Sequence, residues 1–454
     1  MSIQTAASPR KDWKWVTLAD VAKVVTGNTP PTADAQNYGD AIPFVKPTEL
    51  VDRGIRFAPA GLADQALGKA RVVPAGAVLV SCIGNLGKTG LAKVPVAFNQ
   101  QINAVVFNEN VVPEFGFYYA QTLKSWLYDE SSATTLPIIN KGKFQQAPFP
   151  LAPIGEQHEI VAEIEKQFSR LDEAVANLKR VKANLKRYKA SVLKDAVEGR
   201  LVPTEAELAR SEGRACETGG QMLKKVLDHR KPAAKGKRRE VSEPEIGDLA
   251  EAPEGWVWTT CDAAIDAIDA GASFKCVEQP PRDGEIGVLK VSAVSWGIYN
   301  EDESKTCIDA DRIEESYMVK PGDFLFSRAN TIELVGACVI VGAVRKQLML
   351  SDKTLRFKLS DCVLPNWLLV CLRSKFGRNE IERLATGNQE SMRNIGQERI
   401  RHIRMPLPPL SEQKRIVAET DHRLSLVRSV EVEVHVNIKR AQALRQSILR
   451  RAFG

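Results

Sequence analysis

The stretch that decides the fold is Pro150–Glu163, PLAPIGEQHEIVAE, together with its repeat at Pro406–Glu419, PLPPLSEQKRIVAE. The two stretches are offset by 256 residues, and the same offset places Ser191–Lys194 on Ser447–Arg450 without a gap. A match that keeps its register over roughly forty residues is the mark of an internal repeat. The chain therefore consists of two related halves.

Each repeated stretch opens a long helix. Pro153 precedes the first helix, and Ser411 is expected to cap the second. Apolar residues then recur every seven positions, which predicts a coiled-coil seam rather than a stripe facing a broad core. The expected seam residues are Ile164, Leu171, Leu178, Leu185 and Val192 in the first helix, and Val427, Val434, Ala441 and Ile448 in the second.

The length and charge of the helices indicate how they pair. Helices of about 43 residues would be roughly 60–65 Å long, longer than a small domain is wide, so they are expected to pair with each other. Residues 156–173 carry six acids and two bases, whereas residues 179–194 carry seven bases and no acid. An antiparallel pair sets the acidic start of one helix beside the basic end of the other. The same gradient also suits each helix dipole, so the charges alone leave that alternative open.

The remaining sequence divides around these helices. Short Val-rich segments at 72–80 and 336–342 predict strands, and 115–128 and 365–384 have helical spacing, without a βαβ rhythm. We expect an α+β fold, with two mixed α/β units separated by two long helices that form an antiparallel coiled coil with pseudo-twofold repeat. The expected segments are a globular unit at 1–152, a helix at 153–200, a linker at 201–252, a globular unit at 253–408 and a helix at 409–454.

The linker is expected to hold a short amphipathic helix near 223–227. The basic run at 229–239 follows, and acids come directly after it. A solvated tether explains this run better than a phosphate-binding segment.

Composition excludes several classes of protein. The chain has 454 residues, a formal net charge of +7 and 44% hydrophobic residues, which is ordinary globular composition. The longest apolar run, at 335–344, is half a bilayer span, and the N-terminus lacks a secretory pattern, so we expect no membrane segment and a cytoplasmic location. The spacing of the eight cysteines and five histidines matches no metal module, so no metal or other cofactor is expected.

No catalytic motif is complete. Gly84–Thr89 resembles the end of a phosphate-binding loop, but Cys82 stands where the motif needs glycine. Asn28–Pro31 is a scrambled version of the segment with which a DNA methyltransferase holds a flipped base, and no glycine-rich cofactor loop is present. We therefore expect no catalytic residue.

Polar and basic side chains on turn-rich segments remain, in corresponding parts of both halves. Lys, Arg, Asn and Gln read base edges or neutralise phosphates, although each taken singly is more often an ordinary surface residue. The candidates for DNA binding are Lys46, Asn85, Lys88, Gln100, Gln101, Lys141 and Lys143 in the first half, and Lys290, Arg328, Asn330, Lys353, Asn388, Gln389 and Arg393 in the second.

In this organisation the chain resembles the DNA specificity subunit of Type I restriction-modification systems. The resemblance covers essentially the whole chain. It rests on the Pro-Leu-x-Pro-x-x-Glu-Gln junctions at 150–157 and 406–413, the helix endings at 191–199 and 447–454, the Trp-rich starts of both units, and Asn99–Gln101.

The resemblance implies two target-recognition domains, each reading one half of a bipartite, asymmetric DNA sequence. The helices would set the spacer and dock two methyltransferase subunits that modify adenine with S-adenosylmethionine, and restriction subunits with translocase activity would complete the complex. One departure is that the second helix lacks the tail seen after the first as Gly199–Leu201. The two docking surfaces are therefore expected to be unequal.

Two other functions stay open. One is a coiled-coil adaptor that joins two protein-binding modules, whose affinity would depend weakly on salt, whereas phosphate neutralisation makes affinity fall steeply with salt. The other is a single-chain methyltransferase with a degenerate motif, which would transfer methyl groups without a partner.

Overall fold

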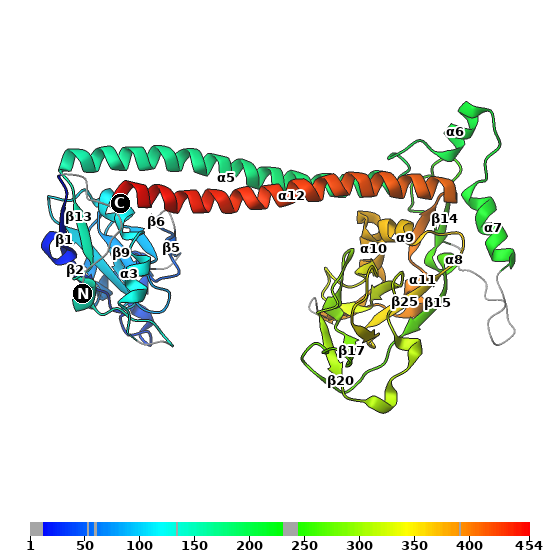
Figure 1. Cartoon of the computed structure of the whole chain (residues 1–454), viewed down its shortest axis with the longest axis horizontal. Helices are drawn as coiled ribbons and strands as arrows, with labels where there is room; N and C mark the ends of the chain where they lie inside the picture. Colours follow the sequence, from blue (N-terminus) through cyan, green and yellow to red (C-terminus); the bar gives the residue numbers. More distant parts are fainter. Residues whose placement is uncertain (1–11, 52–53, 59–60, 133–134, 230–243, 390–391) are drawn as a thin grey trace. The chain divides into compact units, whose positions relative to one another are not determined.

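The computed structural model describes residues 12–51, 54–58, 61–132, 135–229, 244–389 and 392–454. Contacts divide the chain into two compact units, residues 1–180 with 434–454 and residues 181–433. Both long helices cross this division, so each helix contributes one part to each unit (Figure 1).

The first unit is built on a four-stranded antiparallel sheet in the order β10-β9-β12-β2. A smaller sheet in the order β4-β11-β8 packs against it, and Leu79, Phe98 and Ile102 are fully buried in the core that they share. The strands of these sheets are β2 (Ala22–Thr26), β4 (Phe44–Val45), β8 (Val72–Val73), β9 (Val78–Ser81), β10 (Thr89–Leu91), β11 (Val96–Phe98) and β12 (Ile102–Phe107).

Shorter elements complete the first unit. They are the antiparallel pairs β1 (Lys14–Thr17) with β13 (Pro148–Leu151), β3 (Tyr38–Gly39) with β7 (Gly61–Leu62) and β5 (Leu50–Val51) with β6 (Gly54–Ile55), and the helices α1 (Leu18–Val21), α2 (Pro113–Ala120), α3 (Lys124–Asp129) and α4 (Lys141–Phe144).

The second unit repeats this plan. Its main sheet has the order β15-β25-β21-β23, and a two-stranded pair, β14 with β28, takes the place of β1 with β13. The strands are β14 (Val257–Thr260), β15 (Ile265–Ala270), β21 (Phe324–Ser327), β23 (Cys338–Ile340), β25 (Thr354–Leu359) and β28 (Arg404–Leu407). The helices are α8 (Cys261–Ala264), α9 (Pro365–Arg373), α10 (Lys375–Leu384) and α11 (Gln397–Arg401).

Three further sheets belong to the second unit. One has the order β16-β20-β17-β24, with β16 (Cys276–Val277), β17 (Ile286–Leu289), β20 (Ser304–Cys307) and β24 (Gln347–Met349). The others are β18 (Val294–Ser295) with β19 (Ile298–Tyr299), and β22 (Ala329–Asn330), β27 (Met392–Asn394) and β26 (Thr386–Gln389) in the order β22-β27-β26. The mixture of strands and helices confirms the α+β class.

Several predicted elements are interrupted. The helix expected at 115–128 is two helices, because Thr122 donates its hydroxyl to the carbonyl of Tyr119 and replaces a helical bond. The helix expected at 365–384 breaks at Ser374, whose hydroxyl accepts the N–H of Gly377 and caps α10. The strand expected at 72–80 splits into β8 and β9, and only residues 338–340 of the segment 336–342 pair as a strand.

The described part of the linker, residues 201–229 and 244–252, contains two helices. The first is α6 (Glu205–Glu212), and the N–H of its first residue, Glu205, donates to the buried carboxylate of Glu412 at 2.8 Å. The indole of Trp256 donates to the same carboxylate at 2.7 Å. α7 (Gly219–His229) includes the amphipathic segment expected near 223–227, and its Met222 packs against Leu407. The basic run beyond His229 lies outside the described residues.

The two long helices are α5 (Ile154–Val197) and α12 (Leu410–Phe453), each of 44 residues. The prediction that Ser411 caps the second is wrong: the helix begins at Leu410, and the carbonyl of Pro409 already accepts the N–H groups of Glu412 and Gln413. Across the described residues, no helix combines the length and apolarity that a membrane span requires.

A buried glutamine at the start of each long helix explains the repeated Glu-Gln pair. Gln157, with 0% exposure, accepts the N–H of Val112 and donates to the carbonyls of Asn110 and Ala152. Gln413, also with 0% exposure, makes the same three bonds in the second unit, to the N–H of Leu364 and the carbonyls of Cys362 and Pro408. Each amide therefore joins a helix start to its globular unit.

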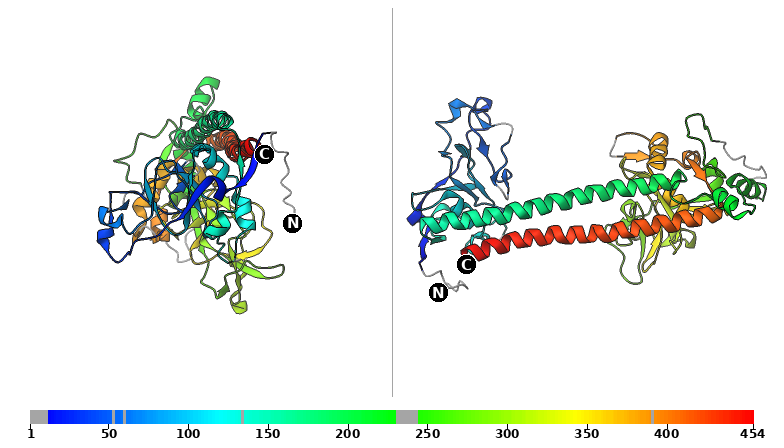
Figure 2. Two further views of the ribbon diagram at one scale, coloured as in Figure 1. Left: turned by 90° about the vertical axis from the view of Figure 1, so that its left-hand side faces the viewer. Right: turned by 90° about the horizontal axis from the view of Figure 1, so that it is seen from above.

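The helices pair head to tail within each unit (Figure 2). In the first unit, Arg445 of α12 lies 4.0 Å from the ring of Phe168 and 3.3 Å from the carboxylate of Asp172, both of α5. In the second unit, Lys189 of α5 meets Glu431 of α12 at 2.6 Å. The partner in α12 therefore moves from residue 445 back to residue 431 as the contact in α5 moves from residue 172 forward to residue 189. The pair is antiparallel, as the charges indicated.

The expected seam residues lie on the less exposed side of both helices. Ile164, Val192, Val427 and Val434 are buried, and Leu171, Leu178, Leu185, Ala441 and Ile448 are partly buried. Lys189 and Arg445 occupy equivalent positions under the 256-residue offset, so each unit carries one basic residue in its seam.

We predict that Gln413→Leu destabilises the protein more than an exposed change does. The substitution removes the three hydrogen bonds that the amide makes to one N–H and two carbonyls, and a buried group that loses its bond costs about 1–3 kcal/mol. Urea unfolding monitored by circular dichroism measures the loss. Gln442→Ala, at an exposed position of the same helix, is the matched control, and equal stability of the two variants would contradict the role of the amide.

We also predict that the seam pair Lys189–Glu431 contributes to orientation through its charges. Lys189→Glu alone places two acids together and lowers stability, whereas the double variant Lys189→Glu with Glu431→Lys restores most of the loss. A partly exposed pair couples by about 0.2–1 kcal/mol. A double-mutant cycle in urea measures the coupling, and a value of zero would show that the two side chains act independently.

Candidate DNA interface

Four segments meet at one end of the main sheet in the first unit. The N–H of Ser81 donates to the carbonyl of Lys88, and the carbonyl of Ser81 accepts from Gly87, which closes the turn after β9. The N–H of Cys82 then donates to the carbonyl of Gln101, and its carbonyl accepts from Ile139. We call Ser81–Cys82, Gly87–Lys88, Gln101 and Ile139 the first junction.

The second unit contains the same arrangement of bonds. The N–H of Ser327 donates to the carbonyl of Ala337, and its carbonyl accepts from Gly336, as at Ser81. The N–H of Arg328 donates to the carbonyl of Lys353, and its carbonyl accepts from Ile395, as at Cys82. We call Ser327–Arg328, Gly336–Ala337, Lys353 and Ile395 the second junction.

The turn glycines explain part of this equivalence. Gly87 and Gly336 have φ angles of 77° and 79°, a left-handed conformation that favours glycine. Their neighbours differ, however: Cys82 corresponds to Arg328, and Gln101 corresponds to Lys353. The two junctions therefore share a backbone frame but differ in some of their side chains, and Cys82 is buried in the first junction.

Most candidates of the first unit lie at or beside the first junction. Asn85 is exposed at the tip of the β9–β10 turn, and the ammonium of Lys88 bonds to the carbonyl of Pro47 at 3.3 Å, next to exposed Lys46. α4 begins directly after Ile139 and carries exposed Lys141 and Lys143.

The two glutamines and Lys143 are already engaged within the protein. Gln100 accepts the hydroxyl of Thr29 at 2.6 Å, and Gln101 accepts the side-chain amide of Asn99 at 3.0 Å. Lys143 forms an ion pair with Glu130 at 2.9 Å.

The sheet β22-β27-β26 gathers candidates at the second junction. Asn330 of β22 pairs with Arg393 of β27, and Arg393 donates to the carbonyl of Gly387 at 2.6 Å. Arg328, directly before β22, lies 3.5 Å from the side chain of Asn394. Lys353 is exposed, with its ammonium 3.2 Å from Asp352.

Three candidates stand apart. Asn388 and Gln389 belong to strand β26, but their side chains lie outside the described part of the chain. Lys290 follows β17 in a different sheet, and its ammonium lies 3.5 Å from Glu278.

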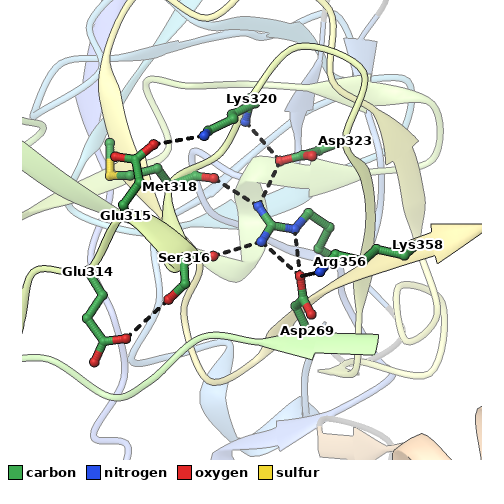
Figure 3. Close-up of polar contacts among 9 residues, drawn as sticks. All are labelled: Asp269, Glu314, Glu315, Ser316, Met318, Lys320, Asp323, Arg356 and Lys358. Atoms are coloured by element: carbon green, nitrogen blue, oxygen red, sulfur yellow. Dashed lines mark hydrogen bonds and ion pairs between the residues drawn. The ribbon is translucent and has the colours of Figure 1, made fainter. Parts of the chain in front are cut away.

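Arg356 is an arginine that sequence reasoning did not single out. Figure 3 shows its guanidinium surrounded by Asp269, Asp323 and the carbonyls of Ser316 and Met318, to which it donates five hydrogen bonds. Although burial raises the pKa of Asp269, hydrogen bonds from Arg356 and Lys358 bring that pKa below its ordinary value. Because all its donors are used, Arg356 holds the 316–318 segment in place and is not available to a ligand.

Arg378 was also missed, and it supports the second junction. Its guanidinium lies 4.6 Å from the ring of Trp296 and donates to the carbonyls of Ile332 and Val335. These bonds fix the segment between β22 and β23. No signal in the sequence marks this role, because an arginine on helix α10 is expected on a solvated face.

Comparison with known proteins gives one consistent family. Residues 10–187 match the model of the Type I restriction modification DNA specificity domain. The chain is 32% identical over 234 residues to the EcoEI specificity subunit of Escherichia coli, covering 50% of this chain and 38% of that subunit. It is 22% identical to the EcoKI specificity subunit of Escherichia coli K12, covering 97% of this chain and 88% of that subunit.

A solved structure shows the same fold along the chain. It describes the structural basis of complex assembly and conformational transition of the type I R-M system, with a TM-score of 0.63, 19% identity, and coverage of 98% of this chain and 99% of that chain. Both relatives are specificity subunits of Type I restriction enzymes. Residues 10–187 therefore match the DNA specificity domain of Type I restriction-modification systems, and the chain is similar to specificity subunits of such systems over almost its whole length.

Proposed function

We propose that the chain, acting in the cytoplasm, reads a bipartite and asymmetric site on double-stranded DNA, with one half of the site read at each junction. The observation that carries this proposal is the shared frame with unlike side chains. A common backbone would present residues to a groove in the same way twice, and different residues would select different bases. Two copies with the same side chains would instead favour a symmetric site.

The charge at the junctions supports DNA as the ligand. Lys88 and Lys141 belong to the first junction or adjoin it, and Arg328, Lys353 and Arg393 belong to the second or adjoin it. Phosphate contacts come mainly from Lys and Arg, and base contacts from Arg, Asn and Gln. Asn85 and Asn330 sit beside these cations as candidates for base contacts.

The helices are proposed to set the spacer between the half-sites and to dock two methyltransferase subunits. Several large apolar side chains on these otherwise charged helices are exposed, which suits a surface that a partner covers. They are Val181 and Tyr188 of α5, and Leu426, Val430, Val432 and Leu444 of α12. Restriction and translocase subunits would join the same assembly.

The adaptor hypothesis predicts a different behaviour in salt. Two protein-binding modules would bind DNA weakly, with a salt slope near zero, whereas each phosphate that the protein neutralises adds about 0.9 to the slope of log K against log salt.

We predict that the two junctions control different halves of the recognised sequence. Asn85→Ala relaxes discrimination in one half-site and Arg328→Ala in the other, each by about 1–3 kcal/mol per lost base contact. Sequencing of adenines methylated by the chain together with its methyltransferase subunit measures both changes. The chain alone is expected to transfer no methyl group.

Lys375→Ala is the matched control, because this lysine is exposed in the second unit and stands at the start of α10, outside the second junction. It should leave both half-sites unchanged. If Asn85→Ala and Arg328→Ala altered the same half, or if neither altered any base preference, the assignment of one half to each junction would be wrong.

We further predict that lengthening both helices lengthens the spacer. Seven residues inserted after Leu178 and seven after Val434 keep the heptad phase and fall between the contacts of Arg445 and those of Lys189. The insertion adds about 10 Å, or roughly three base pairs. Methylation sequencing should show the same half-sites with a longer gap, and an unchanged gap would refute the spacer role.

A further inference from the structure

Two cysteines of the second unit face each other across neighbouring strands. Cys276 of β16 and Cys307 of β20 are direct partners in an antiparallel pair, and both are partly exposed. Side chains of directly opposed residues lie on the same face of a sheet. The two thiols are therefore neighbours, although 31 positions separate them in the sequence.

The register makes Cys276 and Cys307 a non-hydrogen-bonded pair, the kind of antiparallel pair in which the two Cα atoms lie closer together. The N–H of Ile308 donates to the carbonyl of Lys275 at 3.0 Å, so the bond lies one residue outside the cysteines. Opposed residues in such a position have Cα atoms about 4.5 Å apart. A disulfide spans Cα separations of about 4.4–6.8 Å, so the backbone already allows the bond.

A cluster of charges surrounds the pair. Glu278, two residues after Cys276, contacts the ammonium groups of Lys305 and Lys290, and Lys305 stands two residues before Cys307. β16 is a two-residue strand at the edge of its sheet and pairs with β20 alone. A disulfide between these residues would link the edge strand β16 covalently to β20, its only neighbour among the described strands of the sheet.

The other six cysteines, all among the described residues, are not paired across strands with a partly exposed cysteine. Cys82, Cys261, Cys338, Cys362 and Cys371 are buried, and burial raises the pKa of the thiol of Cys82 to about 12. Partial burial and the neighbouring thiol of Cys307 raise the pKa of Cys276 as well, so the property that sets the pair apart is its exposure to a dissolved oxidant. Cys216 is partly exposed in the linker and belongs to no strand, so it serves as an internal reference.

We propose that Cys276 and Cys307 are a modification site that peroxide oxidises to an intramolecular disulfide. One thiolate attacks the peroxide oxygen, becomes a sulfenic acid and releases one water. The second thiol displaces the hydroxyl of the sulfenic acid as another water and forms the S–S bond. Two thiols and one hydrogen peroxide thus give one disulfide and two waters, and thiol reductants reverse the change. The proposal does not depend on the proposed function.

The test is a non-reducing peptide map of the full chain after treatment with hydrogen peroxide. Trypsin cuts after Lys275, Arg282, Lys305 and Arg312, so each cysteine leaves on a short peptide, CVEQPPR and TCIDADR. We expect these two peptides to appear as one linked species, about 2 Da lighter than their sum, and to separate again with dithiothreitol. Hydrogen exchange of residues 276–285 should slow in the oxidised chain.

Single variants complete the test. In Cys276→Ser, peroxide should carry Cys307 to sulfenic and higher acids without a linked peptide, and Cys307→Ser should behave likewise. Cys216→Ser should leave the linked species unchanged. The proposal is overturned if the unmodified sequence yields only separate oxidised peptides, or if Cys216 is found linked to either cysteine in preference to the pair.

Discussion

The buried glutamine amide at the start of each long helix is the interaction on which the rest of the structure depends. Gln157 and Gln413 each form three hydrogen bonds with backbone groups outside the long helices. Each amide fixes where a helix of 44 residues leaves its globular unit. A small error in the direction of so long an element would misplace its far end by many ångströms. The Glu-Gln pair stands in both halves of the repeat, within the stretch where the two halves match most closely.

The junctions show the complementary pattern. Their bonds run between backbone groups, so side chains can change without disturbing the frame. A cysteine in one unit and an arginine in the other occupy the same place, and so do a glutamine and a lysine. Arg356 and Arg378 behave differently, because their guanidinium groups are consumed by carboxylates and carbonyls of the protein. An arginine that uses all five of its N–H groups within the protein, as Arg356 does, holds a loop in place and has no donor left for a ligand.

The long helices and their antiparallel pairing could be predicted because the evidence is periodic and local: the heptad spacing, the offset of 256 and the charge gradient all lie within continuous segments. The breaks at Thr122 and Ser374 could not, because single hydroxyls that compete for backbone bonds do not disturb the apolar spacing. The sequence suggests candidate residues, but it does not reveal the backbone bonds that bring segments from four parts of the chain into one junction. The facing of Cys276 and Cys307 depends on strand register, which spacing alone does not reveal.

The contribution of α12 to the first unit has a consequence for biosynthesis. Leu449 and Phe453 are part of the core of that unit, where the ring of Phe453 lies 5.1 Å from that of Phe115. A nascent chain that has completed residue 180 therefore still lacks a piece of its first hydrophobic core, and that core can close only after residues 449–453 have been translated. Synthesis of the first unit thus begins before that of the second and ends after it, and during this interval chaperones have an exposed aromatic surface to bind.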